Sequence, residues 1–271
     1  MNPAMRIVVL GSGGPHVVSD RGGPGVLVMV DDELLLFDCG RGTSTKIVTA
    51  NRRLSSVGSV FLTHYFHYDH TCDLVTLAIS GWMDGRSEPM KVYGPPVTGE
   101  FVQSLFYEAY RDDLNSRSGS TRPKAGREFI CMDLADGQEV VNLGHWTVTA
   151  KNVVHGIRPE YRAIAYRVES YEGRSVAVSG DCRLCDGMLR IARGVDMLIA
   201  ECSYMEDEGT GMGLVHMGPD EVGRLAADAG VGSVVLYHLG YKVDPEAACA
   251  RIERVFTGRV VAARDLMQMT V

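Results

Sequence analysis

Thr63-His64-Tyr65-Phe66-His67-Tyr68-Asp69-His70 is the stretch of the sequence that decides the fold. It gathers three of the chain's eight histidines and an aspartate into a few consecutive positions. An apolar run, Ser59-Val60-Phe61-Leu62, precedes it and is typical of a buried strand. Imidazole nitrogens and a carboxylate at the end of a strand suit a borderline transition metal such as zinc. The stretch therefore predicts a metal site rather than a histidine-rich surface turn.

Length and composition indicate an ordinary globular protein. The chain has 271 residues, of which 45% are hydrophobic and 23% charged. We expect one domain over residues 1–271, because this length can bury a large core. The formal net charge is −7 and no long basic run occurs. Since phosphate backbones are bound by Lys and Arg, we expect a small-molecule substrate and no nucleic-acid partner.

The N-terminal residues and the cysteines indicate the compartment. Residues 1–6, Met-Asn-Pro-Ala-Met-Arg, lead directly into a strand-like run, without the basic and apolar regions of a signal peptide. No apolar stretch approaches the length of a membrane span. The seven cysteines are scattered and odd in number, which is typical of reduced thiols. We therefore expect a cytoplasmic protein with no membrane partner, and a homodimer is compatible with the sequence.

Strand-like and helix-like segments occur in both halves of the chain. Two such halves predict sheets that pack on each other with helices outside them. The expected strands are 6–10, 25–30, 33–37, 59–63, 90–93, 129–132, 139–141, 146–154, 163–168, 175–178, 197–200, 233–237 and 260–262. The expected helices are 43–51, 71–79, 100–114, 188–192, 219–228 and 245–255.

Further histidines and carboxylates lie where the expected strands end. His155 and His238 each close a β-rich run, and Asp38, Asp181 and Glu201 occupy similar positions. The strand ends of packed sheets lie along one edge, so polar residues there can face one another on a rigid frame. One coincidence of this kind means little, whereas several together predict a shared site.

These residues resemble the motifs of the metallo-β-lactamase superfamily, in its ribonuclease Z and arylsulfatase-like branch. The resemblance runs from about residue 6 to about residue 240, and it is specific for fold and metal site rather than for substrate. It implies an α/β protein with the metallo-β-lactamase fold, an αββα four-layer sandwich. The matching segments are 36–40, 62–71, His155 with 165–167, 179–183, 200–204, His216 and 236–239.

The resemblance also implies two divalent metal ions, which we expect to be Zn²⁺, with Mn²⁺ or Fe as alternatives. One ion would be held by two imidazoles of the cluster together with His155 and Asp181. The other would be held by Asp69, His70, Asp181 and His238. Asp181 would bridge the two ions, which would activate a hydroxide as the nucleophile.

The cluster departs from the His-x-His-x-Asp-His pattern of the family by one residue. Counting back from His67, the place of the first histidine falls on Tyr65, and His64 lies one residue further back. Either a bulge at the strand end lets His64 bind, or Tyr65 faces the site and the first metal is weakened. We favour His64, because imidazole is the better ligand.

His216 and Glu201 match positions that assist proton transfer to the leaving group in the ribonuclease Z branch. With Asp69, they are the expected catalytic residues. The alternative for His216 is a histidine that only caps or packs at the start of a helix. His16 and His145 match nothing specific, and we expect them to be structural or surface residues.

The substrate is harder to predict than the site. Bacterial ribonuclease Z enzymes carry a long tRNA-gripping arm between the residues equivalent to His155 and Asp181, where this chain has only two expected strands and a turn. We therefore expect a hydrolase of a small ester, a phosphodiester or sulfate ester first and a lactone or carboxylic ester next. A rival from another class is a non-catalytic binding or sensing protein, which the displaced first histidine supports.

Overall fold

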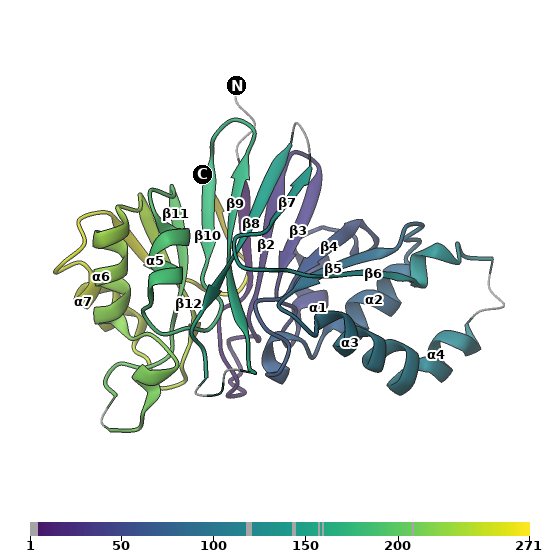
Figure 1. The fold of residues 1–271 in the computed structure, drawn as a ribbon, viewed down its shortest axis with the longest axis horizontal. Coiled ribbons are helices and arrows are strands. Elements are labelled where there is room, and N and C mark those ends of the chain that lie inside the picture. Colours follow the sequence, from purple (N-terminus) through teal and green to yellow (C-terminus); the bar gives the residue numbers. More distant parts are fainter. Residues whose placement is uncertain (1–4, 118–120, 143–144, 157, 159, 208) are drawn as a thin grey trace.

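Two seven-stranded sheets face each other, and helices cover their outer surfaces (Figure 1). The coordinates are a computed structural model that describes residues 5–117, 121–142, 145–156, 158, 160–207 and 209–271. The strand order is β14-β1-β2-β3-β4-β5-β6 in one sheet and β13-β12-β11-β10-β9-β8-β7 in the other. The predicted αββα sandwich of the α/β class is therefore confirmed.

The first sheet mixes antiparallel and parallel pairs. β1, β2 and β3 are antiparallel neighbours, whereas β4, β5 and β6 continue the sheet in parallel. Its strands are β1 (Arg6–Gly11), β2 (Gly25–Val30), β3 (Glu33–Phe37), β4 (Val57–Phe61), β5 (Met90–Gly94), β6 (Phe129–Asp133) and β14 (Met267–Thr270). The helices on its outer face are α1 (Thr43–Thr49), α2 (Leu74–Met83), α3 (Thr98–Gln103) and α4 (Arg111–Ser116).

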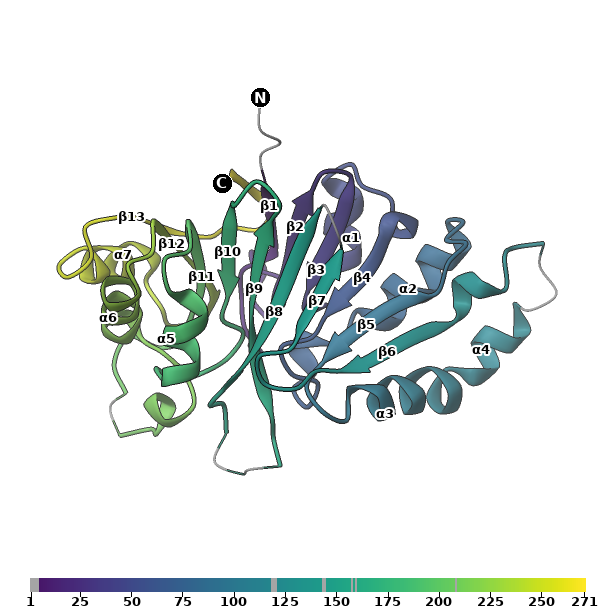
Figure 2. The same ribbon diagram turned by 45° about the horizontal axis from the view of Figure 1, so that its top comes forward.

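The second sheet carries the other helices. Figure 2 shows α5, α6 and α7 together on its outer side. Its strands are β7 (Glu139–Asn142), β8 (Trp146–Val153), β9 (Ala163–Ser170), β10 (Ser175–Val178), β11 (Met197–Cys202), β12 (Ser233–Leu239) and β13 (Arg259–Ala262). The helices are α5 (Asp186–Ala192), α6 (Pro219–Ala229) and α7 (Pro245–Ile252). The short helical turns of the chain are Leu54–Ser56, Tyr68–His70, Ala125–Arg127 and Met212–Leu214.

Three apolar clusters hold the four layers together. A single strand contributes to two of these clusters, as β1 illustrates, because its side chains alternate between two buried faces. Ile7 and Val9 belong to the cluster between the sheets, whereas Val8 and Leu10 belong to the cluster under α1 and α2. A third cluster lies between the second sheet and α5, α6 and α7. The strands are therefore rigid supports, and their ends can place polar groups accurately.

The predicted helix 100–114 is interrupted. α3 passes into a π-helical turn over Ser104–Ala109, and α4 follows it. The amide of Tyr110 donates to the carbonyl of Leu105, so the turn is one residue wider than in an α-helix. The wider turn lets Phe106 point inward and stack on Phe129 of β6, with ring centroids 4.1 Å apart.

Two other strands differ from the expected ones. β4 spans Val57–Phe61 rather than 59–63, so the whole histidine cluster lies in the loop that follows. β14 was not predicted, because two of its four residues are exposed and two are half-buried, and it forms by pairing with β1. In the described part of the chain, no helix has the length and apolarity needed to cross a membrane.

Candidate metal centre

The predicted ligands lie along one edge of the sandwich, where strands from both sheets end. His64 follows β4, His155 follows β8 and Asp181 follows β10. His238 lies near the end of β12. A parallel bridge between Gly13 and Leu239 joins the loop after β1 to this strand and brings the two sheets together here. The structure thus brings all seven predicted metal ligands to a single edge.

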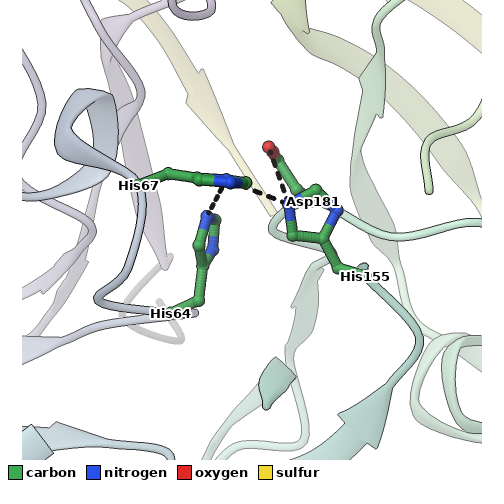
Figure 3. A group of neighbouring side chains, drawn as sticks. All are labelled: His64, His67, His155 and Asp181. Atoms are coloured by element: carbon green, nitrogen blue, oxygen red, sulfur yellow. Dashed lines mark hydrogen bonds and ion pairs between the residues drawn. The ribbon is translucent and has the colours of Figure 1, made fainter. Parts of the chain in front are cut away.

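One ligand group consists of three histidines and an aspartate. The Nδ1 atom of His67 lies 3.2 Å from Nε2 of His64 and 3.1 Å from Nε2 of His155. The Oδ2 atom of Asp181 lies 3.8 Å from Nε2 of His155. Figure 3 shows these side chains pointing toward one another, with His64 and His67 on the same loop and His155 and Asp181 on other segments. Three imidazole nitrogens and a carboxylate oxygen in this arrangement form a four-donor set for one metal ion.

The second ligand group shares Asp181 with the first. The Oδ1 atom of Asp181 lies 3.3 Å from Nε2 of His70 and 3.3 Å from Nε2 of His238. The Oδ2 atom of Asp69 lies 3.3 Å from the same nitrogen of His238. The two oxygens of Asp181 therefore face different groups, which is the arrangement that a bridging carboxylate requires.

The structure places His64, and not Tyr65, in the first group. His64 is fully buried, and its Nε2 atom faces His67. The ring of Tyr65 lies against Phe101 of α3, at a centroid distance of 5.7 Å. No bulge in the strand is needed, because β4 ends at Phe61 and the loop accommodates the additional residue.

The buried imidazoles are oriented by hydrogen bonds on their far side. His70 donates from Nδ1 to Oδ2 of Asp38 at 2.8 Å, which directs its Nε2 atom toward Asp181. Three further Nδ1 atoms are held in the same way, those of His64 by Thr63 Oγ1, His155 by the Val215 carbonyl and His238 by Ser203 Oγ. Within the described residues, buried His70 Nε2 and Asp181 Oδ1 have no hydrogen-bond partner. Such preoriented donors fit a metal ion.

The protonation states also fit a metal. Burial, together with the neighbouring imidazole of His155, lowers the pKa of His67 to about 4. Burial likewise lowers the pKa values of His64 and His155. For Asp181, burial alone would raise the pKa, but His238 and His70 outweigh it and hold the pKa well below its usual range. The first group therefore offers neutral imidazoles and a charged carboxylate, the states in which these groups bind metals. At His70, burial alone would lower the pKa, but Asp181 and Asp38 outweigh it and raise the pKa well above its usual value, so a metal ion would displace a proton there.

Glu201, which is buried, forms a pair with the half-buried His216 beside these groups. The Nδ1 atom of His216 lies 3.0 Å from both carboxylate oxygens of Glu201. Burial alone would lower the pKa of His216, but the charge and hydrogen bond of Glu201 outweigh it and raise the pKa to about 9. Glu201 also accepts hydrogen bonds from the amide of Cys182 and the hydroxyl of Ser203. This carboxylate thus ties His216 to the loop that carries Asp181 and, through Ser203, to His238.

Two glycines let the chain approach the site closely. Gly180 precedes Asp181 with φ of +58°, and a Cβ atom there would lie 2.5 Å from Cβ of Thr63. A Cβ atom at Gly14 would lie 2.9 Å from the ring of His238. Both positions exclude larger residues, because Thr63 fills the space at Gly180 and the predicted metal ligand His238 fills it at Gly14.

A cavity beside the ligands contains residues that the sequence did not single out. It measures about 580 Å³, and both His216 and His238 line it. His16, which we expected to be structural or on the surface, lies at its rim with its ring centroid 4.2 Å from that of Tyr241. The only signals in the sequence were the position of His16 after the glycine turn and of Tyr241 shortly after His238. His145 lies far from the ligands and bonds Asp31 at 2.8 Å, as expected for a surface residue.

Known proteins resemble this chain over its whole length. A family model described as "Beta-lactamase superfamily domain" matches residues 34–239. The ribonuclease Z of Methanosarcina mazei is 29% identical over 304 aligned positions, which cover 98% of both chains. That of Mycobacterium bovis is 27% identical over 286 positions, again covering 98% of both chains.

Solved structures share the fold. The metallo-β-lactamase fold protein YhfI from Bacillus subtilis superposes with a TM-score of 0.79 at 21% identity and covers 100% of both chains. The short form of human tRNase Z superposes with a TM-score of 0.76 at 20% identity and covers 98% of both chains. At these identities the superpositions show that the fold is shared and nothing more.

Our expectation of a small-molecule substrate and no nucleic-acid partner is wrong. The relatives that match over 98% of their length are named as ribonucleases, whose substrates are nucleic acids. The expectation relied on the short segment between His155 and Asp181 and on the net charge of −7. The net charge sums over the whole surface and does not describe the charge at one edge. With the family model covering most of the chain and the ligand groups in place, the chain belongs to the metallo-β-lactamase superfamily of metal-dependent hydrolases and resembles its ribonuclease Z members.

Proposed function

We propose that the protein hydrolyses phosphodiester bonds in RNA at this edge of the sandwich. The observation that carries the proposal is the position of Asp181, whose two oxygens face two separate ligand groups. The full-length similarity to enzymes named ribonuclease Z supports RNA as the substrate class. The rival of a binding protein with an incomplete metal site loses its support, because His64 lies with its partners in the first group.

Two ligand sets would hold two divalent cations, and Zn²⁺ suits their nitrogen and oxygen donors. They are His64, His67, His155 and Asp181 for one ion, and Asp69, His70, Asp181 and His238 for the other. Such a pair, when bound, would supply an acidified water as nucleophile and would neutralise charge on the phosphate. Around it, Asp38, Thr63, Ser203 and the Val215 carbonyl keep the imidazoles in the required tautomers.

Asp69 and His216 are the proposed catalytic groups of the chain itself. Burial alone would raise the pKa of Asp69, but the hydrogen bond from His238 and the charge of His70 outweigh it and lower the pKa. Asp69 is therefore charged and able to accept a hydrogen bond from the attacking water. His216 gives its Nδ1 proton to the bond with Glu201, so its Nε2 proton is available to the leaving oxygen. Glu201 acts through His216 and is a positioning residue.

The test is hydrolysis by purified protein loaded with Zn²⁺ or Mn²⁺. We expect cleavage of a precursor transfer RNA and of the chromogenic diester bis(p-nitrophenyl) phosphate. Asp181→Ala should lower both rates at least about a thousandfold, because it removes a donor from each ligand group. The exposed Asp228→Ala on α6 is the matched control and should retain the wild-type rates. Wild-type rates in Asp181→Ala, or an inert wild-type protein with both metals bound, would refute the proposal.

A further inference from the structure

The 580 Å³ cavity beside the metal ligands is large enough for a small organic group. His216 lines this cavity, whereas the smaller 340 Å³ cavity nearby is lined by His155 instead. Because His216 is the proposed proton donor to the leaving oxygen, the part of the substrate that departs must extend into the cavity next to His216. This step rests on the proposed function.

The walls of the cavity suit a flat, uncharged ring. Tyr241 is 53% exposed, and its ring is paired with that of His16 at an interplanar angle of 36°. The flexible side chains of Met205 and Met212 contribute to the same cavity. Aromatic rings stack with nucleobases of any sequence, and methionine adapts to partners of different shape.

The aromatic pair is held in place beside the histidine cluster. The hydroxyl of Tyr68 donates to the carbonyl of Pro15 at 2.6 Å, which anchors the turn that carries His16. Tyr241 follows β12, the strand that carries His238. The ring pair and the metal ligands are therefore supported by the same segments.

The charges at the rim also favour a nucleic-acid strand. Glu206 lines the cavity, but its carboxylate is paired with Arg251. The ammonium group of Lys242 lies 5.5 Å from the centre of the Tyr241 ring, and the described residues offer it no ion pair. The free charge at the rim is therefore positive, as contact with a phosphate requires.

We propose that this cavity seats the leaving nucleoside of the phosphodiester, with its base stacked on Tyr241 and the next phosphate of the strand beside Lys242. In the reaction, the oxygen of water forms a bond to phosphorus, and the bond from phosphorus to the leaving oxygen breaks. The leaving oxygen takes its proton from His216, and the water releases a proton to solvent. The nucleoside then departs as an uncharged alcohol at its cleaved end.

The first test is binding of adenosine, a product analogue, to the metal-loaded protein by calorimetry. Ribose, which lacks the base, is the reference ligand. We expect adenosine to bind at least about tenfold more tightly than ribose. Tyr241→Ala should lower the affinity for adenosine about tenfold. Tyr241→Phe should keep the affinity within about twofold, because the ring remains. The matched control is Tyr171→Ala, a 78% exposed tyrosine that follows β9, and it should bind adenosine like the wild type.

The second test separates the base from the phosphate. Lys242→Ala should leave the dissociation constant of adenosine unchanged, and it should raise KM for a trinucleotide severalfold with little change in kcat. Equal adenosine binding by wild type and Tyr241→Ala, alongside normal phosphodiester hydrolysis by the wild type, would overturn this inference alone. An inert wild-type protein with both metals bound would overturn the proposed function and the leaving-group role together.

Discussion

Asp38 holds His70 by a hydrogen bond of 2.8 Å between Oδ2 and Nδ1, and both side chains are buried. The other oxygen of Asp38 accepts the amide of Thr63 at 2.8 Å. Asp38 has φ of +57°, a backbone conformation that non-glycine residues seldom adopt. A residue at the end of β3 thus fixes both the loop after β4 and the tautomer of one predicted metal ligand.

Asp38→Ala should weaken metal binding in the second group about 10- to 100-fold, because His70 loses the partner that fixes its ring. Asp31→Ala is the matched control, since Asp31 also has positive φ but lies in the β2–β3 turn beside His145. Titration with a chromogenic chelator measures both affinities. Equal losses in the two variants would assign the effect to backbone conformation and not to His70.

Gly14→Ala should lower phosphodiester hydrolysis at least about tenfold, because the new Cβ atom would lie 2.9 Å from the His238 ring and displace this ligand. Gly58→Ala in β4 is the control, since no atom lies within 4 Å of its added Cβ. The rate and the metal content of both variants should be measured together. Full activity with two bound metals in Gly14→Ala would show that the ring does not need its present position.

Glu201→Gln should slow cleavage of RNA, whose leaving group is a poor one, more than cleavage of bis(p-nitrophenyl) phosphate. The reason is that Glu201 holds His216, and p-nitrophenolate leaves without needing a proton. We expect the cleavage rate to fall about tenfold or more for RNA and less than about threefold for the chromogenic diester. Similar losses on both substrates would place the effect of Glu201 on the fold of the site rather than on proton transfer.

Asp265 should contribute pH-dependent stability. Burial opposes its charge, but Lys46, the amide of Gly22 and Ser12 outweigh it and lower the pKa of Asp265. Because the pKa is lower in the folded protein, this stabilisation is present above pH of about 4 and is lost as the pH falls through the folded-state pKa. Asp265→Asn should lower the free energy of unfolding by about 2 kcal/mol at pH 7, the scale of hydrogen bonds to a charged group. The loss should be smaller near pH 3.

Urea unfolding of metal-free protein at several pH values measures this effect. The exposed Asp228→Asn on α6 is the control and should change the free energy of unfolding little at any pH. A cost for Asp265→Asn that stays constant down to pH 3 would contradict the assignment of the lowered pKa.

The strands and the gathering of the candidate ligand residues at one edge could be predicted because both depend on short stretches of sequence. Apolar runs such as Ser175–Val178 lead directly into the polar residue that matters, here Asp181. His64 is a similar case, because an imidazole is a better donor than the phenol of Tyr65 wherever the loop places it.

The cavity and the similarity to ribonucleases that act on nucleic acid could not be predicted from local patterns. His16 and Tyr241 come from opposite ends of the chain and meet only through the folded sandwich. The strand β14 depends on β1 in the same way. The error about nucleic acid had other causes. The short segment between His155 and Asp181 counted against a transfer-RNA substrate, and a total charge hides a local arrangement in which Glu206 is paired and Lys242 remains at the rim.

The most direct test of the account is a metal titration of the metal-free protein, in which hydrolysis of a phosphodiester is followed against the number of bound ions per chain. We predict that activity appears as two ions bind per chain, and that Asp181→Ala neither binds the pair tightly nor gains activity. Hydrolysis by metal-free protein, or two tightly bound ions in a chain that stays inactive on every phosphodiester, would contradict the account.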